Sequence, residues 1–113
     1  MKIVVAAAFL AALTTPAFAH AFLQHASPGA GQTVAAPKQI DLTFDKTLEP
    51  SLSGASITDA DGHDAGAGPA HVEDTLMTLP LPALKPGTSH VTWHVVSTDA
   101  HQTQGSYNFT VQP

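Results

Sequence analysis

Three residues of this chain have types and positions that suit a metal ion: His20, Asp99 and His101. His20 follows Ala17-Phe18-Ala19, a small-x-small sequence typical of a signal-peptidase site. Cleavage after Ala19 would make His20 the first residue of the mature chain, with a free α-amine beside its imidazole Nδ1. An α-amine has a reference pKa of about 7.7–8 and an imidazole about 6.5, so a divalent metal can displace the protons near neutral pH. Cleavage is therefore expected to create a chelating group.

Asp99 and His101 are two positions apart, in a loop expected between two strands. Side chains two apart in extended backbone project to the same side, so both can approach one ion. Together with His20 they offer three nitrogens and one carboxylate oxygen. This set suits Cu(II), which the Irving–Williams order places above other divalent ions, whereas zinc would accept similar donors but prefers a tetrahedron. Asp-x-His alone is a weak motif, and the pairing with an N-terminal histidine is what favours a metal site.

Other metal donors in the chain are fewer or weaker. The sequence has no cysteine, which excludes thiolate sites, and Met77 is the one methionine after residue 19, so a thioether Cu(I) site is not expected. His63 and His71 flank a Gly/Ala/Pro loop at residues 65–69 and could form a secondary site. Two solvated loop histidines are the simpler interpretation, because short histidine patterns have many false positives.

The first 19 residues have the pattern of a cleaved secretory signal. Lys2 precedes an apolar run from Ile3 to Leu13, and Thr14-Thr15-Pro16 interrupts that run before the cleavage site. The run is shorter than the roughly 20 residues that span a bilayer. We therefore expect an exported, soluble mature domain covering residues 20–113.

The composition of the expected mature chain excludes several function classes. Removal of 19 of the 113 residues leaves 94, enough for one small domain. These hold three lysines, no arginine and nine acidic residues, a formal charge of −6. This balance argues against nucleic acid and anionic lipid as partners, because binding to both depends on basic side chains. It favours cations instead.

Alternating hydrophobicity predicts short strands separated by turns, with no helical stretch. The clearest strands are residues 88–97 and 105–111, which flank the loop that carries Asp99 and His101. Further strands are expected at residues 22–24, 39–44, 56–58 and 75–79, and Asp61-Gly62 and Lys85-Pro86-Gly87 read as turns. About seven short strands at this spacing indicate an antiparallel sandwich or barrel. The predicted core is Phe22, Ile40, Leu42, Phe44, Ile57, Leu76, Leu79, Val91, Trp93, Val95, Tyr107, Phe109 and Val111.

At several of these positions the sequence resembles the CopC family of periplasmic copper-resistance proteins. The resemblance covers the whole expected mature chain and begins at His20. It includes the elements His25-Ala26-Ser27-Pro28 and Thr58-Asp59-Ala60-Asp61-Gly62. The most specific match is the stretch from Leu84 to His101, which follows the family pattern L-x-x-G-x-Y-x-V-x-W-x-V-x-S-x-D-G-H, with Gly105 to Val111 completing it.

The resemblance implies an immunoglobulin-like Greek-key β-sandwich that binds one Cu(II) per chain and is not an enzyme. The implied ligands are the amine and imidazole of His20 and the imidazole of His101, with Asp99 as a further ligand or a close neighbour. It also implies periplasmic copper homeostasis, by sequestering Cu(II) or passing it to an inner-membrane copper transport protein of the CopD kind. We expect a monomer. One departure is Lys46, near a position that is acidic in the family, and neither it nor its neighbours Asp45 and Glu49 are predicted ligands.

Two other functions are compatible with parts of this pattern. A copper ion on an N-terminal histidine and a second histidine is similar to the histidine-brace site of lytic polysaccharide monooxygenases. A chain of this size leaves little room for a flat polysaccharide-binding face, and a carboxylate would crowd the coordination that O2 needs. The other alternative is an immunoglobulin-like interaction module without metal, in which replacing His20 or His101 would change nothing but surface charge.

Overall fold

The structure is a computed structural model that describes residues 23–66 and 68–113. The described residues form strands and one short 3-10 turn, and none of their helices is long and apolar enough to cross a membrane. The elements are β1 (Leu23–Ser27), β2 (Thr33–Val34), β3 (Gln39–Phe44), η3 (Pro50–Leu52), β4 (Gly54–Thr58), β5 (His71–Glu73), β6 (Leu76–Pro80), β7 (Gly87–Val96) and β8 (Gln102–Val111).

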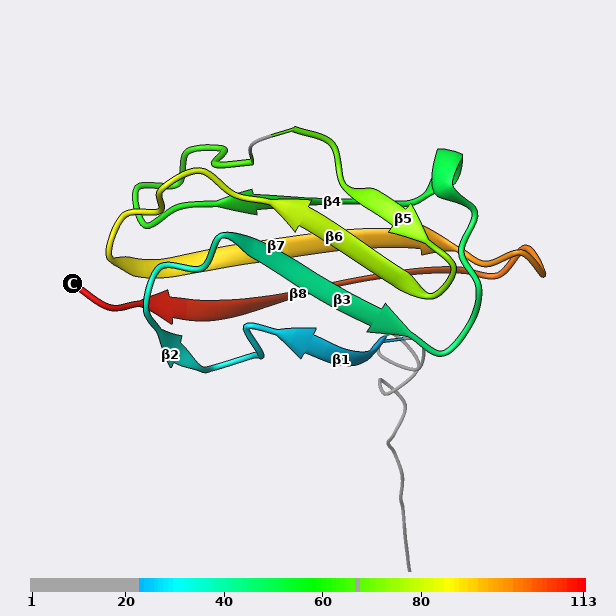
Figure 1. Ribbon diagram of the computed structural model, residues 1–113, viewed down its shortest axis with the longest axis horizontal. Coiled ribbons are helices and arrows are strands. Elements are labelled where there is room, and N and C mark those ends of the chain that lie inside the picture. The colour runs from blue at the N-terminus through cyan, green and yellow to red at the C-terminus, as the bar shows by residue number, and fades with distance from the viewer. Residues whose placement is uncertain (1–22, 67) are drawn as a thin grey trace, which may run out of the picture.

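Two four-stranded sheets lie face to face (Figure 1). One sheet has the order β1-β3-β6-β5 and the other β2-β8-β7-β4, so the chain crosses between sheets several times. The predicted all-β sandwich is confirmed. The structure differs from the prediction in two details. Strands β2 and β5, which are only two and three residues long, were not predicted. Strand β2 also pairs with β8 in parallel, whereas an antiparallel sandwich was expected.

Alternation along the strands builds the core between the sheets. Ile40, Leu42 and Phe44 of β3 are buried, because every second side chain of a strand points to the same face. Trp93 of β7, which belongs to the opposite sheet, is also buried in this core. The Phe44 and Trp93 rings meet edge to face with centroids 5.2 Å apart. Such a contact adds roughly 0.5–1.5 kcal/mol beyond area burial and joins the two sheets.

The predicted core was right at most positions and wrong at Leu76, which is 38% exposed. Leu76 and Leu79 are three positions apart, so they cannot share one face of a strand. Strand β6 instead turns Met77 and Leu79 inward. Tyr107 is only half-buried, and Phe22 lies outside the described residues. The buried apolar set is Ile40, Leu42, Phe44, Leu48, Ile57, Met77, Leu79, Leu84, Val91, Trp93, Val95, Phe109 and Val111.

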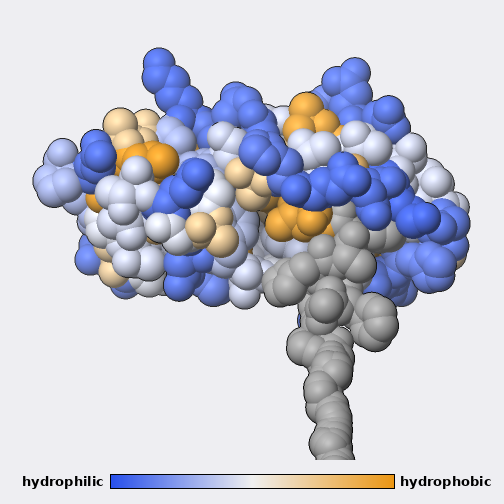
Figure 2. Space-filling model, turned by 90° about the horizontal axis from the view of Figure 1, so that it is seen from below, coloured by the Kyte–Doolittle hydropathy of each residue, from blue (hydrophilic) through white to orange (hydrophobic). Residues whose placement is uncertain are grey.

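The surface is mainly polar. Figure 2 shows a face on which hydrophilic residues dominate and hydrophobic ones form small, separate patches. Leu52 and Leu76 are the large hydrophobic side chains exposed among the described residues. Scattered apolar residues of this kind are usual on a soluble protein.

Strands β7 and β8 form the longest hairpin and fix the position of the predicted ligands. Their register runs from Gly87 opposite Val111 to Val96 opposite Gln102. Strand β8 thus begins three residues before the predicted start at Gly105. The connecting loop is reduced to residues 97–101, so Asp99 and His101 lie at the tip of a rigid ladder.

Candidate metal site

The loop at residues 97–101 is closed by its own backbone. The Ser97 N–H donates to the His101 carbonyl at 2.9 Å, and the Ala100 N–H donates to the Ser97 carbonyl at 2.8 Å. Ser97 is 1% exposed, and its Oγ accepts from the His101 N–H at 3.3 Å. Ala100 has a φ of 72°, in the left-handed region that favours glycine. The turn therefore has a defined shape that includes one strained residue.

The two predicted ligands in this loop are neighbours. His101 Nδ1 lies 3.3 Å from Asp99 Oδ1, and the side chains are 74% and 48% exposed. Asp99 Oδ1 also accepts a hydrogen bond from Ser97 Oγ. A buried hydroxyl thus orients the carboxylate while the imidazole stays open to solvent.

The environment of Asp99 keeps its carboxylate ionised. Hydrogen bonding from the Ser97 hydroxyl lowers the pKa of Asp99 most, and the His101 backbone N–H and the charges of His101 and Lys46 lower it further. Desolvation opposes this shift. Lys46 Nζ lies 3.8 Å from Asp99 Oδ2. An ionised carboxylate beside an imidazole is a suitable partial donor set for a divalent cation.

His20 lies outside the described residues, but the strand that follows it begins at this end of the sandwich. Leu23 at the start of β1 pairs with Phe44 at the end of β3. The segment after Phe44 reaches the loop, because the Thr98 N–H donates to the Thr47 carbonyl at 2.9 Å. Figure 1 shows β1 starting on the side of the molecule where β7 and β8 connect. Three residues of extended chain span about 10 Å, which bounds the distance from Leu23 to residue 20.

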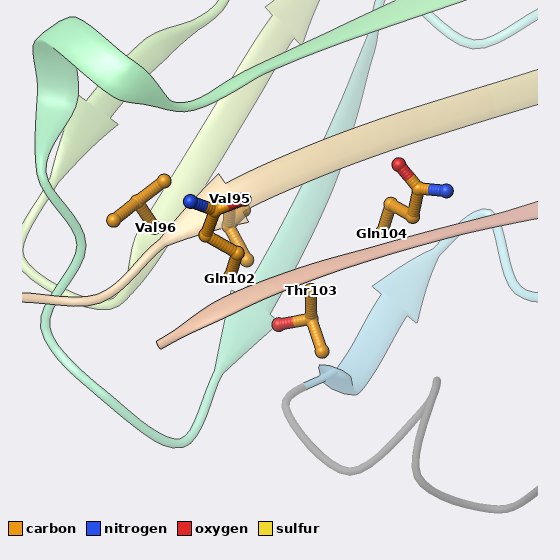
Figure 3. Close-up of a pocket in the computed structure, with 5 residues that line it drawn as sticks. All are labelled: Val95, Val96, Gln102, Thr103 and Gln104. Atoms are coloured by element: carbon orange, nitrogen blue, oxygen red, sulfur yellow. The ribbon is translucent and has the colours of Figure 1, made fainter. Parts of the chain in front are cut away.

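The base of the loop is a shallow surface hollow between β7 and β8. It is lined by Val95, Val96, Gln102, Thr103 and Gln104 (Figure 3). Thr103 points to the side of β8 on which β1 lies, whereas Gln104 points to the opposite side. The inward face of β8 directly after His101 is therefore turned toward the sheet that contains β1.

The structure does not group His63 with His71, the predicted secondary pair. His71 lies in β5 opposite Thr78 of β6. His63 instead lies with Asp59 and Asp61, and their ligand atoms are within 4.8 Å of one another. Asp59 Oδ1 accepts from the backbone N–H groups of residues 61 and 63, and Lys85 Nζ lies 2.7 Å from Asp61 Oδ2. The turn and an ion pair already engage these carboxylates.

The other potential donors lie on strands and not in the loop itself. Met77 is fully buried in the core. His90 hydrogen-bonds with Asn108 on the outer face of β7 and β8. His94 is on the same face, and its ring covers Gly54. His25 is exposed on β1, opposite Thr43.

Sequence reasoning missed two residues of the site. Ser97 reads as an ordinary strand-end serine, and its hydrogen bonds to Asp99 and to the His101 backbone appear only once the loop is closed. The Ser-x-Asp spacing was the one available signal for this contact. Lys46 was set aside as a ligand, but its ion pair with Asp99 crosses 53 residues of sequence.

The CopC domain family matches residues 23–112. This chain belongs to the CopC family. Its CopC-family relatives include copper resistance protein C of Xanthomonas campestris pv. juglandis, 39% identical over 119 residues that cover 97% of this chain and 92% of the relative. Protein YobA of Escherichia coli K12 is 42% identical over 106 residues, covering 88% and 86%.

Solved CopC-family structures have the same fold. CopC from Methylosinus trichosporium OB3b superposes with a TM-score of 0.76 at 39% identity, covering 83% of this chain and 95% of that one. PcoC from Escherichia coli, described as a methionine-rich copper resistance protein, gives a TM-score of 0.72 at 31% identity, with coverage of 80% and 97%. The predicted family is confirmed. CopC-family proteins are periplasmic copper resistance proteins, and copper binding is implied by membership.

Proposed function

We propose that this protein chelates one Cu(II) per chain in the periplasm through His20, His101 and Asp99. Removal of residues 1–19 would leave a domain of residues 20–113 with a free amine on His20. The protein would sequester the ion or pass it to a copper transport protein of the inner membrane, without catalysing a reaction. The observation that carries this proposal is the contact between Asp99 and His101 in a chain of the CopC family.

The loop geometry supports binding at His101. The β7–β8 ladder and the Ser97 hydrogen bonds hold the loop before any ion arrives, so little conformational entropy has to be lost on binding. The His101 imidazole is 74% exposed, so the ion can enter and leave from solvent. A ligand of this accessibility suits a protein that transfers its ion.

The path of the chain supports the participation of His20. Leu23 is fixed beside Phe44, and the segment after Phe44 touches the ligand loop through Thr47 and Lys46. At most about 10 Å of extended chain separates residue 20 from Leu23, so the N-terminal arm starts from the end of the sandwich that carries the loop.

Each proposed ligand would contribute a different donor group to the ion. The amine and imidazole of His20 would close one chelate ring, and His101 would add a nitrogen from a different part of the chain. Asp99 would contribute its carboxylate directly or hold the His101 ring. Protons compete with the ion for these nitrogens, so the affinity for Cu(II) should rise with pH.

Competition titrations of the exported protein with a chromophoric Cu(II) chelator test this function. We expect one Cu(II) per wild-type chain, a large loss of affinity in His101→Ala, and a similar loss in His20→Ala. His90→Ala is the matched control, because His90 lies six positions along β7 from Val96, about 20 Å from the loop, and should leave binding unchanged. Absence of stoichiometric Cu(II) binding by the wild type would refute the proposal.

An oxidation assay on the same protein distinguishes copper binding from copper oxygenase activity. Copper-loaded protein should yield no oxidised products from chitin or cellulose in the presence of a reductant and O2. Products that depend on both copper and His20 would assign the protein to the histidine-brace oxygenases instead.

A further inference from the structure

We propose that Lys46 limits the affinity of the Asp99–His101 site for Cu(II), so that the ion is held less tightly and released more readily. This inference rests on the proposed function, since it concerns the same site. Its basis is an ion pair between two segments that are distant in sequence, with Lys46 Nζ 3.8 Å from Asp99 Oδ2.

Both oxygens of the Asp99 carboxylate are engaged by the protein. Oδ1 accepts from Ser97 Oγ and faces His101 Nδ1, while Oδ2 faces the Lys46 ammonium. A cation that binds Asp99 through Oδ2 must displace the ammonium or tolerate a positive charge a few ångströms away. Either cost lowers the affinity for the ion.

The backbone around Lys46 holds it beside the loop. The Thr47 carbonyl accepts from the Thr98 N–H at 2.9 Å, and Thr47 Oγ1 donates to Asp74 Oδ1 at 2.7 Å. The Leu48 N–H donates to the Asp74 carbonyl at 3.0 Å. The segment is thus fixed on two sides, to the β7–β8 loop and to the β5–β6 turn. The lysine is a built-in neighbour of Asp99, although its side chain is 46% exposed.

Lys46 is also distinct among the three lysines that the structure describes. Lys85 pairs with Asp61, and Lys38 directly precedes β3, whose six residues place it about 20 Å from the Phe44 end. The segment that carries Lys46 also contains Asp45 and Glu49, whose negative charges attract cations. Lys46 therefore opposes a local field that otherwise favours metal entry.

Three variants separate charge from structure. In Lys46→Gln the Cu(II) dissociation constant should fall about tenfold at low salt, equivalent to 1.4 kcal/mol. Lys46→Arg keeps the charge and should retain the wild-type constant. Lys38→Gln removes the same charge far from the site and should also match the wild type. The gain in Lys46→Gln should shrink as salt rises toward about 1 M, because screening weakens the interaction between exposed charges.

The outcomes distinguish this inference from the proposed function. If the wild type fails to bind Cu(II), the proposed function is wrong. If the wild type binds one Cu(II) but Lys46→Gln binds no more tightly, only the role of Lys46 is overturned. The gain should also be smaller in an Asp99→Asn background, and an equal gain there would rule out the ion pair as its cause.

Discussion

The imidazole Nδ1 of His101 lies 3.3 Å from Oδ1 of Asp99, across a single intervening residue. With a proton on Nδ1 facing the carboxylate, Nε2 keeps its lone pair for a metal. Carboxylates next to metal-bound histidines commonly fix the ring in this way and increase its basicity. At the proposed copper site, this contact would give Asp99 a role whether or not its own oxygen binds the ion.

Replacing Asp99 by asparagine should weaken Cu(II) binding by roughly 10–100-fold, because the ring of His101 loses its charged acceptor. Chelator competition at fixed pH measures this change. Asp64→Asn is the control, since Asp64 is exposed and its carboxylate accepts a local hydrogen bond from the Gly66 N–H. Equal affinities of Asp99→Asn and the wild type would remove Asp99 from the site.

Ala100 offers a stability test of the same loop. Its φ of 72° costs an L-residue roughly 1–2 kcal/mol, whereas glycine adopts it freely but loses more entropy on folding. Ala100→Gly should therefore stabilise the protein by about 0.5–1 kcal/mol, a rise of several degrees in Tm. Thermal melts of the two proteins measure this.

The control for Ala100→Gly is Ala30→Gly, at an exposed turn residue without positive φ. It adds the same freedom to the unfolded chain without relieving strain, and should lower Tm. A fall in Tm for Ala100→Gly as well would show that the loop is not strained at this position.

A substitution at Gly105 tests the packing of this residue against Trp93. A Cβ at this position would lie 2.6 Å from Cζ2 of Trp93, closer than real contacts allow, and 3.0 Å from its Cε2. Trp93 is 1% exposed and cannot move freely, so Gly105→Ala should cost roughly 1–3 kcal/mol in urea unfolding. In Gly66→Ala the nearest atom is 3.7 Å away, and stability should hardly change. Equal stabilities of these two variants would contradict the packing described here.

The half-buried phenol of Tyr107 is expected to make the protein less stable at high pH. Burial raises its pKa to about 12, from about 10 in an unfolded chain. The unfolded state therefore ionises first, so the contribution is complete below pH 10 and is lost as pH rises through about 12. After allowance for solvent screening at this half-buried residue, the loss should be about 1–2 kcal/mol.

Tyr107→Phe is the comparison for this pH dependence. It should lack the alkaline loss, and at neutral pH it should be about 1 kcal/mol less stable, because Tyr107 Oη donates to the Pro28 carbonyl at 2.9 Å. Urea unfolding of both proteins from pH 8 to 12 gives the two curves. Parallel curves would show that Tyr107 does not titrate differently in the two states.

Strand positions could be predicted from sequence where alternation is strong, as in β3, whose bounds at Gln39 and Phe44 were predicted correctly. The prediction failed where hydrophobic residues break the period of two. Leu76 and Leu79 were both predicted to be core residues, but the inward face of β6 carries Met77 and Leu79. Strand β2 is two residues long and carries no periodic signal; it exists because β8 offers an edge.

The contact between Asp99 and His101 could be predicted because the two residues are close in sequence. The contacts of Asp99 with Ser97 and Lys46 could not be predicted. Lys46 meets Asp99 only after β3 and the β7–β8 hairpin come together in the sandwich. A lone lysine after a strand gives no sign of such a partner, since ion pairs depend on tertiary geometry. The participation of His20 stays a prediction.

The most direct test of the central claim combines intact mass measurement with Cu(II) titration of the exported protein. The account predicts a mature mass that begins at His20 and one tightly bound Cu(II), with binding lost when the α-amine is blocked by acetylation. Tight binding by a chain that begins at another residue, or unchanged binding after acetylation, would contradict it.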